Sequence, residues 1–542
     1  MNQKSGETFL LVLLIFGATV LFIFGSARLP FLGSDEPRLA EIAKEMMQGK
    51  EYIFPQMGGM PWLEKPIGIF WLMIASYKAL GISEMAARLP AALMALLSAW
   101  LIYFLVSRLT DRKRGMVCFL MVSTSAFFVF FSHAANCDMF LTCCIIAAFV
   151  CFLLYEQEPA RKSFLYAMYA CAGIGVLAKG FIALIITGIS ILAYLVTARR
   201  VKDVLKMNAL AGVLIVLCVC SIWFVPITLV GGREFWNVYF FQQQIQRYTA
   251  GLRHHHSEGI LFYLPITLLG AFPWTVTPFF ARKTDRPQPA RNLIRLCLCW
   301  LLTTVLFFSL SKSQTSSYIL PAIPPFCVLG GLFLVEYFER TEKLPLAMIL
   351  LIGMTNALAI LVAFWFSQKL NIYCNGLLAF LITIGVITVV SLILIANRKF
   401  VWALGLYALI SFAGFYTFVN AIFPELNRIE SKPLSLAIKP SLTGTTKLLI
   451  YDFPDYVPLF YTDGRIELTP EGYIYEVNNP EQLYRYLFQK ETAYVLIDNL
   501  DLEWMSKDDE WKAESVVRGR DLSILKLTLP QGKHHHHRRL TG

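Results

Sequence analysis

Apolar runs long enough to cross a membrane, divided by short polar connections, make up this chain as far as residue 423. A spanning helix needs about 20 apolar residues, and residues 8–27, 89–107, 180–198 and 207–232 come close to or exceed that length. Counting the charged interruptions predicts about thirteen spanning helices, at 8–27, 89–107, 115–132, 139–155, 163–178, 180–198, 207–231, 259–281, 295–311, 316–335, 344–367, 375–397 and 400–423.

One further apolar run, Pro66 to Tyr77, is too short to span and predicts an interfacial or re-entrant helix. If this run does not cross the membrane, all Lys and Arg clusters between spans fall on the same face of the membrane. The positive-inside rule predicts that this face is cytoplasmic. The N-terminus is then cytoplasmic as well. The opposite, outer face receives the loop at 28–88, the turns at 133–138, Lys179 and 312–316, the loop at 232–258 and everything after 424.

Beyond residue 424 the chain changes character. Strand-like runs, KLLIYDF and AYVLIDNL, alternate with polar helical stretches. We expect three parts: a transmembrane domain at 1–423, which includes the outer loop at 28–88 with its interfacial helices, a soluble α/β domain at 424–531, and a disordered tail at 532–542.

Composition agrees with a membrane protein, since 56% of the 542 residues are hydrophobic, 16% are charged and the mean hydropathy is +0.57. The net charge of +11 follows from basic clusters between spans, so it indicates membrane topology rather than nucleic-acid binding. The twelve cysteines show neither a disulfide framework nor zinc-binding spacing.

Charged groups near a bilayer are costly unless they face water or a partner, so those on the outer face are candidates for function. Each also has a structural explanation. Asp35, Glu36 and Arg38 follow Ser34 as a helix start would, and Glu64 with Lys65 could simply precede the short apolar helix.

The remaining candidates lie in later outer turns. Asp138 could begin a helix, and Lys179 could extend its ammonium to the interface. Arg247 and the histidines at 254–256 fall in an aromatic loop typical of an interfacial helix, and Tyr318, next to Lys312, could be a membrane anchor. Together these carboxylates and cations favour a reaction of a phosphate, in which Lys and Arg stabilise the charge and a carboxylate handles a proton.

The motifs that carry this chemistry resemble the GT-C glycosyltransferases that use polyprenyl-phosphate sugars, and more closely the family of the aminoarabinose transferase of lipid A. Protein O-mannosyltransferases are more distant. The matching segments, in chain order as far as about residue 325, are SDEPRLAEIAKEM, LEKPIGIFW, AARLPAAL with Arg88, Asp138, LAKGF, FWNVYFFQQQIQRY, HSEGILFYLP with His256 and Tyr263, and SKSQTSSYILP.

The resemblance implies a bacterial inner-membrane enzyme with its site in the periplasm, which transfers a sugar from undecaprenyl phosphate to a lipid, with inversion. The implied catalytic residues are Asp35 and Asp138. The implied substrate-binding residues are Glu36, Arg38, Lys65, Arg88, Lys179, Arg247, Lys312 and Tyr318. A divalent metal (Zn, Mg or Mn) is implied near the phosphate, with Glu64 and His256 as ligands.

Three positions depart from the family. Gln243 and Gln244 stand where relatives carry Glu-His, and Gln314 replaces a second lysine. These changes bear on the sugar and the acceptor more than on the reaction class.

Two other functions stay open. A protein could be the acceptor instead of a lipid. A transporter or flippase is a different class, against which the sequence shows no inverted repeat and places its charges at one face rather than at the midplane.

Overall fold

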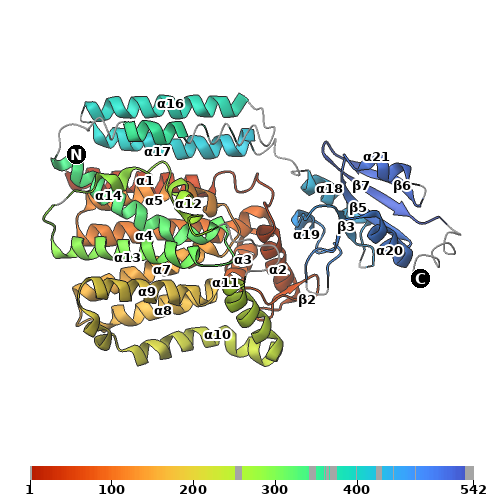
Figure 1. The fold of residues 1–542 in the computed structure, drawn as a ribbon, viewed down its shortest axis with the longest axis horizontal. Coiled ribbons are helices and arrows are strands. Elements are labelled where there is room, and N and C mark those ends of the chain that lie inside the picture. The colour runs from red at the N-terminus through yellow and green to blue at the C-terminus, as the bar shows by residue number, and fades with distance from the viewer. Residues whose placement is uncertain are drawn as a thin grey trace. The chain divides into compact units, whose positions relative to one another are not determined.

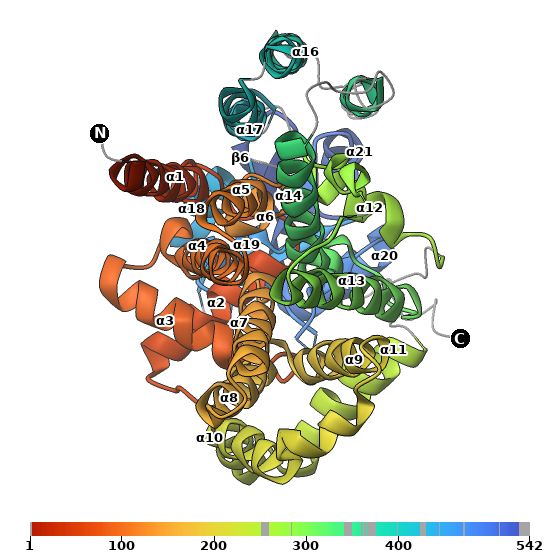
Figure 2. The same cartoon turned by 90° about the vertical axis from the view of Figure 1, so that its left-hand side faces the viewer.

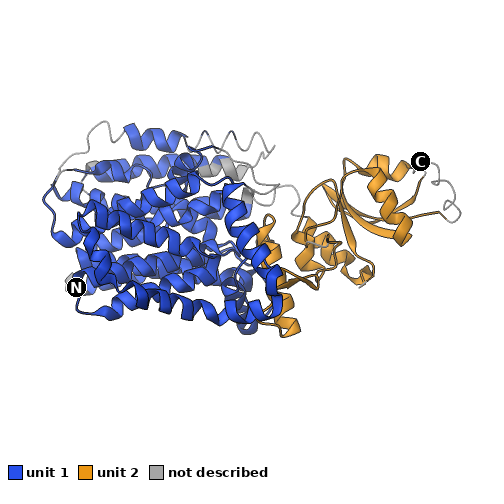
Figure 3. Cartoon of the chain, turned by 60° about the horizontal axis from the view of Figure 1, so that its bottom comes forward, with its two compact units in different colours: residues 1–27, 63–422 blue, residues 28–62, 423–542 orange. Residues whose placement is uncertain are grey.

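The computed structural model describes residues 3–250, 259–282, 284–340, 350–358, 361, 365, 375–397, 399–422, 430–443, 445–469, 472–508 and 510–530. The chain forms two compact units, residues 1–27 with 63–422 and residues 28–62 with 423–542 (Figure 3). The first part of the outer loop, residues 28–62, is therefore grouped with the C-terminal residues.

The first unit is a bundle of apolar helices that run side by side (Figures 1 and 2). In the described residues, seven helices are long and apolar enough to cross a membrane, or eight if the bent pair α5 and α6 is one span. The helices of this unit are α1 (Gln3–Ile23), α3 (Gly68–Leu80), α4 (Glu84–Leu109), α5 (Arg112–Ser123), α6 (Ala126–Ser132), α7 (Asp138–Gln157), α8 (Lys162–Lys179), α9 (Ile182–Thr197), α10 (Ala209–Phe235), α11 (Arg247–Thr249), α12 (Tyr263–Gly270), α13 (Gln288–Ser309), α14 (Ile323–Arg340), α16 (Asn375–Ala396) and α17 (Phe400–Thr417).

The chain is thus a multi-pass helical membrane protein. Three apolar helices are shorter than a span, namely α3, α9 and Leu381–Ile395 within α16. The count of thirteen spans stays a prediction, because part of the chain between 341 and 374 lies outside the described residues.

Two predicted spans are not continuous helices. The run at 115–132 bends by 60° between α5 and α6. The prediction of a single helix at 259–281 is wrong, because α12 ends at Gly270 and a 3-10 turn, η3 (Thr277–Phe280), follows. Pro273 lies between them and lacks the N–H that a continuing helix would need.

A third difference concerns the loop predicted at 232–258, which begins as helix. Gly232 introduces a kink in α10 with φ 52° and ψ −135°, and the π-helix η2 (Trp236–Gln246) carries the chain on to Thr249 in α11. Glycine tolerates this positive φ because it has no Cβ.

The second unit contains a five-stranded mixed sheet in the order β4-β3-β5-β7-β6. Strand β3 pairs in parallel with β4 and β5, whereas β7 pairs antiparallel with β5 and β6. The strands are β3 (Leu448–Tyr451), β4 (Glu476–Val477), β5 (Thr492–Asp498), β6 (Lys512–Arg518) and β7 (Leu522–Thr528).

Helices cover this sheet and close its core. Helix α20 (Pro480–Lys490) begins at Asn479, whose side chain accepts a hydrogen bond from the N–H of Gln482, as an N-cap does. Its apolar face packs with β5 and β7 in one core. The other helices of the unit are α2 (Asp35–Gly49), α18 (Ser431–Ile438), α19 (Val457–Tyr461) and α21 (Leu502–Lys507), and β1 (Gln56–Met57) forms a hairpin with β2 (Met60–Pro61).

Charged residues are buried where α2 packs on α19. Glu41 and Lys44 are 1% and 4% exposed, and the Lys44 ammonium bonds the Glu41 carboxyl at 2.8 Å. Burial raises the pKa of Glu41 to about 8, more than the neighbouring Lys44 lowers it. Partial burial disfavours the ionised form of Asp463, but hydrogen bonds from Lys439 and Lys44 outweigh this and lower its pKa.

These shifts predict how stability depends on pH. The pKa of the Glu41 carboxyl is 4.5 in the unfolded chain and about 8 in the folded chain. Its contribution to stability is therefore fully present below pH 4.5 and is lost as the pH rises to about 8. Thermal unfolding of the full chain in detergent should therefore show falling stability between pH 5 and pH 9, by at most about 5 kcal/mol from this group. The lowered pKa of Asp463 acts only below that window.

Glu41→Gln keeps the side-chain shape but cannot ionise, so it should flatten this pH dependence. Glu481→Gln is the matched control, because Glu481 is 72% exposed and pairs only on the surface with Arg485. If Glu41→Gln and the wild-type chain had equal slopes, the pH dependence would not come from Glu41.

Candidate active site

Asp138 and Lys179 meet at the ends of two neighbouring helices. Helix α7 begins at Asp138 and α8 ends at Lys179, and their side chains form an ion pair with 7% and 13% exposure. A carboxylate is favoured at a helix N-terminus and an ammonium at a helix C-terminus, so each helix stabilises its own charge. The structure therefore brings together two residues that are 41 positions apart.

Tyr318 connects this ion pair to Arg247. Tyr318 belongs to the 3-10 helix η4 (Ser316–Ala322), and its ring centroid lies 4.3 Å from the Lys179 ammonium nitrogen and 5.9 Å from the Arg247 guanidinium carbon. Cations at such distances are attracted to the ring face. Tyr318 thus contacts two cations of the site, beyond the anchoring role that its sequence position also allowed.

The charge of this cluster is positive overall. Arg247 donates from Nη1 to the amide oxygen of Gln243 at 3.1 Å, and that amide is neutral. Lys179, Arg247 and Asp138 then contribute two positive charges and one negative charge. A cluster with this excess suits an anionic group such as a phosphate.

The turn after Lys179 is crowded by residues that the sequence analysis did not single out for this role. Gly180 has φ +88°, and a Cβ there would lie 2.8 Å from the Gln244 amide oxygen and 3.0 Å from the Tyr239 hydroxyl. Tyr239 is fully buried. Only the glycine after Lys179 hinted at this close approach, since glycine is the residue that permits it.

The turn at residues 311–315 contacts Tyr248, the residue after Arg247. The Lys312 N–H donates to the carbonyl oxygen of Tyr248 at 2.9 Å, while the Lys312 side chain is exposed. The Tyr263 hydroxyl donates to the carbonyl of Thr315 at 3.0 Å and accepts from its N–H at 3.1 Å. Tyr263 therefore holds the turn that leads to Tyr318.

Gln314 has a structural role in the same turn. Its side-chain nitrogen donates to the carbonyl oxygens of Ser309 and Gly259, both at 3.3 Å. Its amide thus joins this turn to the end of α13 and to Gly259.

Glu64 and Lys65 precede α3 in a turn, where both are partly exposed. A Cβ on Gly68, at the start of α3, would lie only 2.5 Å from the carbonyl oxygen of Leu177. Helix α3 thus packs closely on α8 two residues before Lys179, which brings the turn with Lys65 toward the same helix end.

Arg88 is 1% exposed within α4 and donates from Nη1 to the carbonyl of Ser26 at 3.0 Å. It ties α4 to the chain just after α1. Its predicted substrate contact stays a prediction.

Asp35, Glu36 and Arg38 belong to the second unit. Helix α2 begins at Asp35, and Ser34 makes no side-chain cap. Asp35 is 54% exposed and pairs with Arg38 at 2.6 Å, whereas the buried Glu36 carboxylate accepts from the N–H of Leu32 at 2.8 Å. Of these carboxylates, Asp35 is the one that faces solvent.

The metal site with Glu64 and His256 as ligands stays a prediction. No three His, Cys, Asp or Glu side chains converge within the described part of the chain. Glu64 is described, but His256 lies in the stretch 251–258, outside the described residues. We assign no step of the reaction to a metal.

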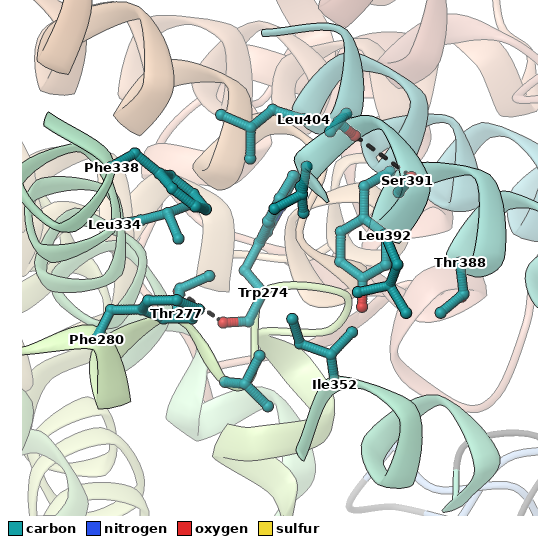
Figure 4. Close-up of a pocket in the computed structure, with 14 residues that line it drawn as sticks. Trp274, Thr277, Phe280, Leu334, Phe338, Ile352, Thr388, Ser391, Leu392 and Leu404 are labelled. Atoms are coloured by element: carbon teal, nitrogen blue, oxygen red, sulfur yellow. Dashed lines mark hydrogen bonds between the residues drawn. The ribbon is translucent and has the colours of Figure 1, made fainter. Parts of the chain in front are cut away.

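A separate cavity lies between η3, α14, α16 and α17 (Figure 4). It encloses about 500 Å³ of empty space, open solvent included, and Trp274, Phe280 and Tyr407 are among its lining residues. Its polar groups are satisfied within the protein: Thr277 donates to the Trp274 carbonyl at 2.7 Å. No charged residue is among its described lining residues, so these residues do not suit a phosphate.

Comparison with known proteins finds glycosyltransferases among those of similar sequence. Residues 64–225 match the family model described as dolichyl-phosphate-mannose-protein mannosyltransferase. The chain is 31% identical over 338 residues to the undecaprenyl phosphate-alpha-4-amino-4-deoxy-L-arabinose arabinosyl transferase of Yersinia enterocolitica, covering 60% of each chain. It is 30% identical over 378 residues to the protein of that name from Pseudomonas paraeruginosa, covering 68% of this chain and 66% of that one. The alignments thus span under two thirds of these relatives.

Solved structures share the fold. ArnT from Cupriavidus metallidurans bound to undecaprenyl phosphate superposes with a TM-score of 0.77 over 95% of this chain and 97% of ArnT, at 21% identity. The Archaeoglobus fulgidus oligosaccharyltransferase gives 0.52 over 92% of this chain and 70% of its own, at 12% identity.

A family-model match across α3 to α10, curated relatives near 30% identity and a shared fold over almost the whole chain agree with one another. The chain is similar to the ArnT-like family of GT-C membrane glycosyltransferases.

Proposed function

We propose that this protein is an inverting glycosyltransferase that moves a sugar, 4-amino-4-deoxy-arabinose or one like it, from undecaprenyl phosphate to a lipid such as lipid A. The observation that carries the proposal is the cluster of Asp138, Lys179, Tyr318 and Arg247, which holds two cations around one aromatic ring. The activity for which these relatives are named supports the donor and the sugar.

The donor's phosphate is the leaving group in this reaction. The bond between the anomeric carbon and the phosphate oxygen breaks, and its electron pair stays on the phosphate. Arg247 and Lys179, with Lys65 from the adjoining turn, stabilise the charge that develops there. Asp138 keeps Lys179 ionised and oriented through their ion pair.

Asp35 acts on the acceptor. Its exposed carboxylate takes the proton of the acceptor hydroxyl while the acceptor oxygen bonds to the anomeric carbon from the side opposite the phosphate. A single displacement of this kind inverts the configuration. Glu36, Arg38, Arg88, Lys312 and Tyr318 contribute to substrate binding in the proposal.

The proposed site lies in the periplasm of a bacterial inner membrane that the chain crosses about thirteen times. The basic clusters between spans support this orientation, with the N-terminus and the cytoplasm on the same side. Residues 424–531 are then a periplasmic domain.

Purified protein in detergent, given undecaprenyl-phosphate sugars and envelope lipids, should yield a lipid heavier by one sugar residue in a mass spectrum. A labelled protein instead of a lipid would make the chain a protein O-glycosyltransferase, which the family-model description also fits. Movement of substrate across vesicles without a new glycosidic bond would identify a flippase.

Asp35→Asn should lower kcat for transfer by about 10²–10⁴-fold, because the amide keeps the shape but cannot accept the proton. The measurement is the initial rate of lipid glycosylation. Asp285→Asn is the control, since the Asp285 side chain is fully exposed outside the proposed site. An Asp35→Asn protein as fast as wild type would remove Asp35 from the mechanism.

Asp138→Ala should destabilise the protein by about 3–5 kcal/mol, because it leaves the Lys179 ammonium buried without its carboxylate. Thermal unfolding in detergent measures this loss. The double variant Asp138→Leu with Lys179→Met removes both charges and should recover stability while transfer stays lost.

The exposed Glu158 gives the matched control for this pair: Glu158→Ala breaks surface ion pairs and should cost less than about 1 kcal/mol. If the double variant regained transfer along with stability, Lys179 would have no part in binding the phosphate.

A further inference from the structure

The second unit holds its helix α2 by a charged cluster, which we define as the buried Glu41 and Lys44 of α2 with Asp463, 36% exposed, from the turn after α19. The Lys44 ammonium donates to the carboxyl of Glu41 at 2.8 Å, to a carboxylate oxygen of Asp463 at 2.8 Å and to the carbonyl of Phe460 at 2.9 Å. An ammonium has three donors, so the cluster uses all of them. Two of the three acceptors are more than 410 positions away.

The turn that supplies Asp463 is shaped for this contact. Asp463 has φ 55° and Gly464 has φ 72°, both in the left-handed region. A Cβ on Gly464 would lie 3.1 Å from the Glu45 carboxylate, so the backbone of this turn lies directly on α2. The second carboxylate oxygen of Asp463 pairs with Lys439 at 2.6 Å.

Further contacts fix both ends of α2. Near its N-terminus, the Arg38 guanidinium lies 4.9 Å from the Tyr456 ring centroid, and the Phe31 ring packs edge-on against Phe460 at 4.8 Å. Toward its C-terminus, the Glu45 carboxylate accepts from the N–H of Gly58 at 2.7 Å. The helix that begins with Asp35 is thus held along its length by the C-terminal residues and by the β1–β2 hairpin.

A buried cluster of charges is a poor way to gain net stability, because an apolar replacement of similar shape does as well or better. It does impose one geometry, since each charge is satisfied only in one register of α2 on α19. Fixing the register of α2 also fixes the position of Asp35, which lies six residues before Glu41 on the same helix.

We propose that Lys44 and Asp463 are positioning residues, through which the C-terminal region fixes α2 and so holds Asp35 for the transfer reaction. The catalytic part of this inference rests on the function proposed above. The role it gives the C-terminal region is to orient the first outer loop without touching the reacting atoms.

The structural part is tested first, by hydrogen exchange of the full chain in detergent. In Asp463→Ala, the amides of α2 should exchange faster, while β3, β5 and β7 keep their protection. Arg485→Ala is the control in the same unit, because Arg485 is 73% exposed on α20 and pairs only with Glu481. Unchanged exchange in α2 would refute the positioning role, whatever the activity.

The catalytic part is tested by kinetics. Asp463→Ala should lower kcat by about 10²-fold, the effect of displacing a reacting group by about 1 Å, with KM for the sugar donor unchanged. In an Asp35→Asn background the same substitution should have no further effect on kcat, because its whole effect passes through Asp35. Additive losses would overturn the proposal.

Asp463→Asn serves if the alanine variant does not fold, because the amide oxygen can still accept from Lys44, while the charge and the acceptor for Lys439 are lost. Its kcat should fall less than that of Asp463→Ala, and an equal or larger fall would contradict positioning by hydrogen bonds. If wild-type protein transfers no sugar to any acceptor, the proposed function fails, and the exchange result separates that failure from a failure of the cluster.

Discussion

A charge that is withdrawn from water needs an opposite charge beside it, and the pair of Asp138 and Lys179 meets this need in the helical unit. The pair depends on two antiparallel helices whose ends coincide: α7 begins at Asp138 and α8 ends at Lys179. Each helix end also favours the charge that it carries. Tyr318 and Arg247 are arranged around this pair, so the shape of the candidate site depends on how α7 packs on α8.

The second unit also contains a buried cation with carboxylates beside it. There Lys44 is buried against residues from both ends of the sequence, and its bonds join the first outer loop to the C-terminal region. The C-terminal residues are therefore part of the structure that presents Asp35, which a division of the chain at residue 424 would not suggest. A domain with no recognisable catalytic motif can still contribute to a reaction if it orients a loop that has one.

Departures from the family also acquire a physical meaning. Gln243 provides a neutral amide oxygen that accepts a hydrogen bond from Arg247. Gln314 uses its amide to join the carbonyls of Ser309 and Gly259, a bond that a lysine would make with a different geometry and with an added charge.

The sequence by itself determined the class of protein, because apolar runs near 20 residues permit little except membrane helices. It also identified Asp138, Lys179, Arg247 and Tyr318 as candidates, since charges and interfacial aromatics stand out in an apolar chain. Local patterns could not show the contact of Tyr239 with the Gly180 turn. The burial of Lys44 and its ion pair with Asp463 could not be seen either, since Glu41 and Lys44 match an exposed ion pair on a helix surface equally well. Only tertiary structure decides these features, because they depend on segments that are distant in the sequence meeting in space, whereas hydrophobic length is a local property that each segment carries alone.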